Sequence, residues 1–202
     1  MELLGFVLAA MIALTIHKSR EQGARVALLA KYLGKYQIER QMQSLIDGYM
    51  RWLGEQDPDR QRQLRGMLDG LEQSLSGQFA SFAEDIKGLS APLAQVNKLP
   101  FWMPFAQQLL PGYRLFDARR AFAIHASGIA AVARNAEGLA PRDQAFMMTA
   151  ELLLMQHTCH WFCRSKTVAS ARLVVQHQTP YAQVLRSVSP DTVRAYRELT
   201  GS

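Results

Sequence analysis

The sequence has few of the features that mark secreted proteins and the common enzyme classes. Only two cysteines, Cys159 and Cys163, occur among its 202 residues. Four positions apart on one helix, they cannot readily form an unstrained disulfide, and such cysteine usage is typical of a reducing compartment. There is no glycine-rich phosphate loop, no nucleophile elbow, no internal repeat and no alternating strand pattern. The sequence therefore predicts an all-α protein and points to no particular reaction.

Charge is missing from residues 3–16, where Thr15 is the only polar side chain. As a helix, about 14 residues reach about 21 Å, which is short against a hydrocarbon core of about 30 Å. His17 and Lys18 can lengthen the span, because such side chains reach toward the interface. The segment has no polar face suited to a surface helix. We predict a membrane anchor over residues 1–17, with a buried or oligomer-contact helix and a cleaved signal sequence as the alternatives.

Positive charge follows this segment directly. The basic residues after it are Lys18, Arg20, Arg25, Lys31 and Lys35, opposed only by Glu21. The positive-inside rule then places the N-terminus outside and the body in the cytoplasm. A cleaved signal would begin with basic residues, whereas Glu2 stands here. The sequence predicts a protein of a bacterial-type inner membrane that contacts lipid through residues 3–16.

The formal net charge of +6 also raises the question of nucleic acid as a partner. The remaining basic residues are dispersed in small groups, such as Arg60, Arg62 and Arg65. No helix-turn-helix or zinc-finger spacing accompanies them. We therefore do not expect a nucleic-acid partner.

Apolar residues recur at helical spacing over residues 24–53 and 58–89. Asp57 is expected to cap the second helix, with Pro58 at its first position. The apolar seam of that helix consists of Leu64, Leu68, Leu71, Leu75, Phe79, Phe82, Ile86 and Leu89. Such a seam predicts an antiparallel hairpin with the preceding helix, and glycines beside it (Gly66, Gly70, Gly77) are expected to allow close approach.

Residues 90–113 differ in character, because four of the eight prolines fall there. Between them lies an aromatic cluster that the prolines keep from forming one helix. Its members are Phe101, Trp102, Met103 and Phe105. Three interpretations are open: a buried loop that plugs one end of the bundle, a membrane-interface contact, and a partner-binding patch.

Further helices are predicted over residues 114–136 and 145–175, with a last one beginning at Pro190 behind an N-cap at Ser189. The long one is apolar nearly all round at first, which indicates the centre of a bundle. The whole is predicted as an all-α bundle of about five helices. Its parts are the anchor (1–17), the hairpin (18–89), the connector (90–113) and the C-terminal helices packing on the hairpin (114–202).

The densest group of reactive side chains lies near the end of the long helix. It consists of His157, Cys159, His160 and Cys163. Imidazole and thiolate together suit zinc, copper(I) or haem iron, although this spacing matches no established motif and needs another donor, His125 or Glu151. The alternatives are packed cysteines with hydrogen-bonded histidines, and a thiol switch.

Glu151 itself lies on an apolar helix, where burial would raise its pKa and permit a catalytic role. Pairing with His125, Arg119 or Arg134 is the alternative that we expect.

Three hypotheses of function follow. The first is a membrane-tethered, cytoplasm-facing scaffold or assembly subunit that acts through a protein partner or self-association and needs no cofactor. The second is a metal- or haem-binding sensor or enzyme that uses the His157–Cys163 group. The third is a small-molecule pocket within the bundle, which composition alone suggests.

Overall fold

The computed structural model describes residues 2–201 and is mostly helical, as expected for an all-α protein. The α-helices are α1 (Glu2–Leu33), α2 (Ile38–Gly54), α3 (Pro58–Asp85), α4 (Ala91–Ala94), α5 (Ala106–Leu109), α6 (Ala118–Ala133), α7 (Pro141–Cys163), α8 (Lys166–His177), α9 (Tyr181–Ser187) and α10 (Pro190–Thr200). Two 3-10 helices, η1 (Ile86–Gly88) and η2 (Gly112–Arg114), and two strands, β1 (Gln95–Asn97) and β2 (Leu115–Asp117), complete the described residues. The prediction of about five helices was too low, because expected long helices are divided and the connector adds short ones.

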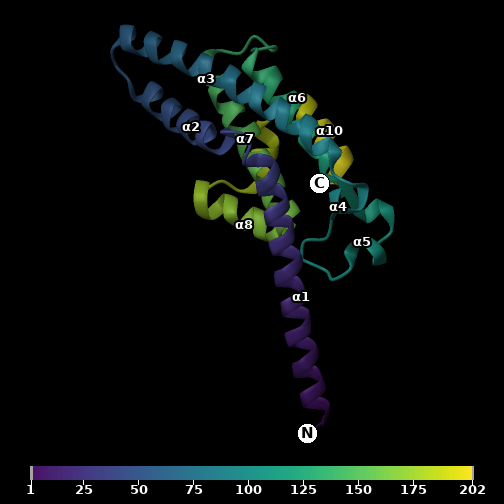
Figure 1. Ribbon diagram of the computed structural model, residues 1–202. Helices are drawn as coiled ribbons and strands as arrows, with labels where there is room; N and C mark the ends of the chain where they lie inside the picture. Colours follow the sequence, from purple (N-terminus) through teal and green to yellow (C-terminus); the bar gives the residue numbers. More distant parts are fainter. Residues whose placement is uncertain (1, 202) are drawn as a thin grey trace.

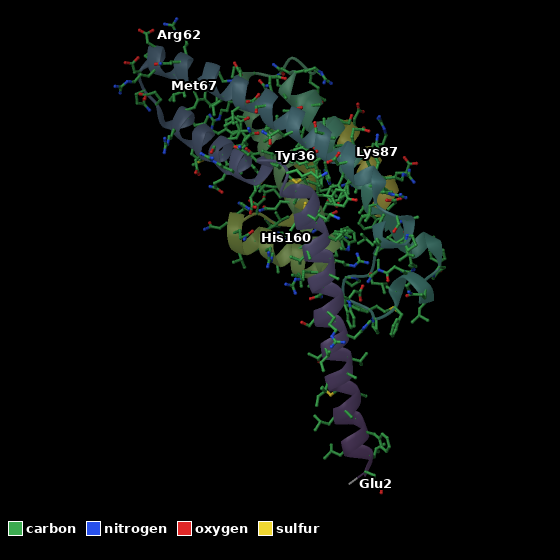
Figure 2. The ribbon with its side chains drawn as sticks, viewed as in Figure 1. Glu2, Tyr36, Arg62, Met67, Lys87 and His160 are labelled. Carbon is green, nitrogen blue, oxygen red and sulfur yellow. The ribbon has the colours of Figure 1, made fainter. Side chains whose placement is uncertain are left out.

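Helix α1 is one continuous helix of 32 residues. Its residues 2–16 project from the body and are all exposed, and Glu2 marks their far end (Figures 1 and 2). This helix is long and apolar enough to cross a membrane, and none of its most apolar window is buried. The expected long apolar helix at the N-terminus is therefore present and exposed.

The helix predicted over residues 24–53 is divided in the structure. α1 ends at Leu33 and α2 begins at Ile38, so that only α2 forms the hairpin with α3. The turn between them is held by Asp85 of α3, whose Oδ2 accepts hydrogen bonds from Lys35 Nζ at 2.7 Å and from Tyr36 Oη at 2.9 Å. Because Asp85 is distant in sequence from this turn, local patterns do not reveal the contact, and a single helix over residues 24–53 was wrongly predicted.

The hairpin of α2 and α3 otherwise follows the prediction. Asp57 caps α3 by accepting hydrogen bonds from the backbone amides of Asp59 and Arg60. The seam faces inward, since most of its side chains are buried and Leu64 and Leu71 are half-buried against the core. The close approach lies at Gly48 of α2, where an added Cβ would be 2.5 Å from Leu68 Cδ2. The three glycines of α3 meet nothing nearby, so the close approach was predicted on the wrong helix.

Helix α7 lies at the centre of the body, between the hairpin, α6 and α1 (Figure 1). Most of its side chains are buried, as the apolar sequence of its first half predicted. It ends at Cys163, however, and Ser165 caps a separate α8, so the single helix predicted over residues 145–175 is wrong. The break turns α8 back against α7.

The connector between η1 and α6 contains α4, α5, η2 and an antiparallel ribbon in which Val96 pairs with Phe116. Strands of three residues are too short to show an alternating pattern, which is why none was predicted. β2 also takes the residues expected to begin a helix at 114. α6 begins only after Asp117, whose side chain accepts a hydrogen bond from Arg119 N at 2.9 Å.

Candidate functional site

The aromatic cluster of the connector packs on α1 where the exposed half of that helix meets the body. Trp102 Nε1 donates a hydrogen bond to Glu21 Oε2 at 3.0 Å. The ring of Phe105 stacks on His17 at a centroid distance of 4.7 Å, and Lys18 Nζ lies 5.9 Å from the centre of the Trp102 ring. We call Trp102, Phe105, His17 and Lys18 the collar.

Only part of the cluster is sheltered. Trp102 and Met103 are half-buried, whereas Phe101 and Phe105 remain 60% and 53% exposed. Phe105 also holds a left-handed backbone conformation with φ of 56°. Trp102 and Phe105 thus lie against α1, while the rings of Phe101 and Phe105 stay largely exposed. The three interpretations of the cluster stay predictions.

The reactive group at the end of α7 is divided between two sides of that helix. His157 faces α8 and α9, where its Nε2 lies 3.1 Å from Ser170 Oγ and its ring stacks on Tyr181. Burial lowers the pKa of His157 to about 3, helped by the positive charge of Lys166. Cys159 and Cys163 lie on the other side, toward α1 and α2, while His160 lines the same space as these cysteines and also contacts Arg172 of α8.

Within residues 2–201, no three His, Cys, Asp or Glu side chains lie close enough together to hold a metal ion. Burial raises the pKa of the Cys159 thiol well above its usual range and that of Cys163 to about 11. Both thiols are thus protonated at neutral pH, whereas the thiolate is the form that binds metals and attacks disulfides. The metal or haem hypothesis stays a prediction, which elemental analysis and an absorption spectrum of the native protein would test.

The two further donors considered for that site belong to other contacts. His125 is fully buried, with Nε2 2.8 Å from Thr158 Oγ1, which in turn lies 2.9 Å from Tyr196 Oη. Glu151 Oε1 accepts a hydrogen bond from the backbone amide of Ser189, the N-cap of α10. Glu151 thus contacts the start of α10 and not the histidine or arginines with which pairing was expected.

The backbone of α6 approaches Glu151 closely at Gly128. A Cβ added there would lie 2.6 Å from Glu151 Oε2 and would also collide with Thr192 Oγ1. Burial raises the pKa of Glu151, while the hydrogen bonds from Thr192 and Ser189 oppose that rise. The arrangement explains this buried acid as a contact that fixes α10 on α6 and α7.

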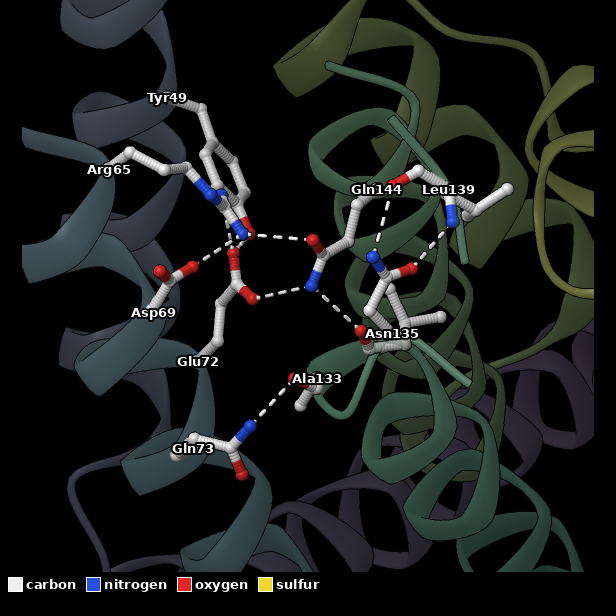
Figure 3. Close-up of polar contacts among 10 residues, drawn as sticks. Tyr49, Arg65, Asp69, Glu72, Gln73, Ala133, Asn135, Leu139 and Gln144 are labelled. Carbon is white, nitrogen blue, oxygen red and sulfur yellow. Dashed lines mark hydrogen bonds and ion pairs between the residues drawn. The ribbon is translucent and has the colours of Figure 1, made fainter. Parts of the chain in front are cut away.

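A second polar network joins the hairpin to the end of α6 and the start of α7 (Figure 3). Glu72 of α3 is at its centre and is fully buried. Glu72 Oε1 accepts a hydrogen bond from Tyr49 Oη at 2.6 Å and pairs with Arg65 Nη1 at 2.8 Å, while Oε2 accepts from Gln144 Nε2 at 3.1 Å. Gln144 also donates to the carbonyl of Val132. These bonds join side chains of α2, α3 and α7 and a carbonyl of α6, so the network stabilises the packing of these helices.

A groove of about 520 Å³ lies between α1, α2, α7 and α8. Its walls are largely apolar and include Leu29, Met42 and Met155, and two arginines, Arg164 and Arg172, stand on its lining. Cys159, His160 and Cys163 line the same space. Sequence reasoning did not locate this groove, because the groove depends on where α1 and α8 pack. The suggestion of a pocket lined by methionines was a partial signal.

Comparison with protein-family models, with curated proteins and with solved structures gave no match to this chain.

Proposed function

We propose that this protein is a membrane-tethered helical scaffold or assembly subunit that acts through protein contacts at the cytoplasmic face of a bacterial-type inner membrane. The observation that supports it is the form of α1. A single helix is exposed and apolar over residues 3–16 and then packs on the body through buried Gln22 and Leu29. Exposing that much apolar side chain to water is unfavourable, and a bilayer removes the cost.

The collar supports the position of the body against the bilayer. Aromatic rings favour the membrane–water interface, and lysine near the end of a span reaches toward the head groups. The collar combines these side chains at the point where the apolar half of α1 ends. The exposed rings of Phe101 and Phe105 would then lie at head-group depth, beside the basic residues that follow residue 17. This charge distribution supports a cytoplasmic body.

The hairpin supports the scaffold part of the proposal. α2 and α3 extend from the body at the end opposite the projecting half of α1 (Figure 1). Met50 of α2 and Met67 of α3 are both exposed there. Methionine is a flexible apolar side chain that adapts to a partner surface. We expect the partner, a different protein or a second copy of this chain, to contact this end.

Membrane fractionation with an alkaline wash tests the tether. The full chain is expected in the washed membranes and a chain lacking residues 1–17 in the soluble fraction. Leu8→Arg should weaken insertion, because an arginine near the centre of a span costs about 3 kcal/mol. Ala27→Arg, at an exposed position of the packed half of α1, is the matched control and should stay in the membrane. Equal solubility of the full and shortened chains would contradict the tether.

The same membranes test the scaffold. A photo-reactive amino acid at position 67 should give a discrete cross-linked product with a protein or a second copy, while one at the exposed Val175 of α8 should not. If the two positions give the same products, contact through the hairpin is contradicted even though the tether stands.

A further inference from the structure

The groove beside α1 has two chemically different parts. Toward Tyr36, the turn after α1, it is walled by Leu33, Ile38, Met42 and Met155. Toward the projecting half of α1, it is bordered by Arg164, which donates a hydrogen bond through Nη1 to Gln22 Oε1 at 2.6 Å. In Figure 2, Tyr36 lies farther from Glu2 than His160 does, which gives the direction of the groove along α1. Its cationic end therefore faces the segment proposed to enter the bilayer.

The two cysteines that line the groove are neutral thiols and belong to its apolar walls. Cys159 Sγ contacts Met155 Sδ at 3.8 Å, and burial raises the pKa of both Cys159 and Cys163. Neutral thiols and a thioether behave as apolar, polarizable groups. They suit the surface of a hydrocarbon chain.

The two arginines are available to an anion from outside the protein. Arg172 Nη1 lies 3.3 Å from His160 Nδ1, and arginine can only donate, so His160 must accept at that nitrogen. Burial lowers the pKa of His160 to about 4, with Arg172 and Arg164 adding to the effect, so the ring is neutral at pH 7. Among residues 2–201, neither arginine forms a salt bridge. The lining carries one acid, Glu39 of α2, against the two arginines, so the groove as a whole has a net positive charge.

We propose that this groove binds a single-chain lipid with an anionic head group. The chain lies along α1 between α2 and α7, and the carboxylate or phosphate of the head contacts Arg164 and Arg172. The volume falls in the range of about 300–1,000 Å³ that is usual for small-molecule sites. Burial of the chain supplies binding energy, and guanidinium groups recognise carboxylate and phosphate through paired hydrogen bonds.

This inference goes beyond the proposed scaffold and does not depend on it. The groove is formed by the packed half of α1 and persists whether or not the other half spans a bilayer. A membrane would supply the lipid.

Photolabelling of the full chain in nanodiscs tests the proposal. The probes are photoactivatable palmitic acid and photoactivatable lysophosphatidylglycerol, which distinguish a free fatty acid from a lysophospholipid as the source. Labelling by either probe should map to peptides of α2 or of α7 around Met155. Ala30→Trp places a large ring in the groove from an exposed position and should remove that labelling. Ala27→Trp, one turn earlier on α1 and outside the groove, is the matched control and should not.

The head-group contact is tested separately. The double variant Arg164→Gln and Arg172→Gln should weaken labelling by the anionic probes about tenfold, as expected for the loss of a charged hydrogen bond. A photoactivatable long-chain alcohol should label this variant and the original chain alike. The proposal is overturned if neither anionic probe labels the groove, if Ala30→Trp leaves labelling unchanged, or if the arginine variant binds the anionic probes normally.

Discussion

The two halves of α1 share one unbroken helix but meet different surroundings. In the second half, Leu29 is only 6% exposed because it packs into the core with side chains of α2 and α7. In the first half, Leu14 is 46% exposed and no part of the body covers it. The same residue type therefore contributes to folding at one position and, on our proposal, to membrane attachment at the other.

The pattern of side chains explains where the change occurs. The first half is apolar on all sides, which suits lipid, whereas the second half alternates apolar residues with charged ones such as Arg25 and Lys31. Arg25 also bonds the carbonyls of Phe162 and Gln95, so it fixes the packed half to α7 and to the connector. The helix runs unbroken through Gly23. Fold and tether are thus separable properties of one element, which the following predictions test.

Acid should show the largest difference between the halves, because it should destabilise the body that the second half packs on and leave membrane attachment by the first half unchanged. Burial lowers the pKa of His125 and of His157 to about 3, below the value of about 6.5 in the unfolded chain. Between pH 6.5 and pH 3 the unfolded state binds more protons than the folded state. The stability that the two neutral histidines contribute is therefore fully present above pH 6.5 and is lost as the pH falls toward 3. Two such groups lose roughly 5 kcal/mol of unfolding free energy between pH 6.5 and 4.5.

Thermal unfolding in nanodiscs, followed by tryptophan fluorescence, should show this loss while the chain stays bound to the membrane. His125→Gln, which retains a group able to bond Thr158, should make the stability of the body less dependent on pH. An unchanged dependence in that variant would contradict the assignment of acid sensitivity to this histidine.

Matched leucine substitutions should separate the halves next. Leu29→Ala leaves a cavity in the core and should lower the unfolding free energy by about 3 kcal/mol. Leu14→Ala removes the same atoms from the uncovered half and should leave the unfolding of the body unchanged. Chemical denaturation in mild detergent measures both. Equal destabilisation by the two variants would mean that the first half also packs on protein.

Sequence alone was sufficient for features that are local. The apolar stretch of residues 3–16, the seam of α3, the Asp57 cap and the start of α10 at Ser189 all appear in the structure where local patterns put them. These depend on side-chain periodicity and on hydrogen bonds within a few residues, which a single sequence records directly.

The errors occur where distant residues decide the outcome. The turn at residues 34–37 is held by Asp85, and the break after Cys163 leaves Thr167 N bonded to the carbonyl of Pro100. The four residues proposed as metal ligands lie within seven positions of one another in sequence, yet the turn of α7 directs His157 toward α8 and α9 and the two cysteines toward α1 and α2. The groove depends on the packing of four helices, so no local pattern could define it.

The smallest effect should come from the boundary between the halves, at Trp102. Trp102→Phe keeps the ring against α1 but removes the hydrogen bond from Nε1 to Glu21, which costs about 1 kcal/mol. Hydrogen exchange of the connector around residues 99–106 should then be about fivefold faster. Lipids brominated near the head group should quench the fluorescence of Trp102 in the original chain. That quenching should disappear in Trp102→Phe. It should persist in Trp52→Phe, because the ring of Trp52 lies buried in the hairpin. Quenching that follows Trp52 instead would place the bilayer at the hairpin and reverse the proposed arrangement, because the collar would then be remote from lipid.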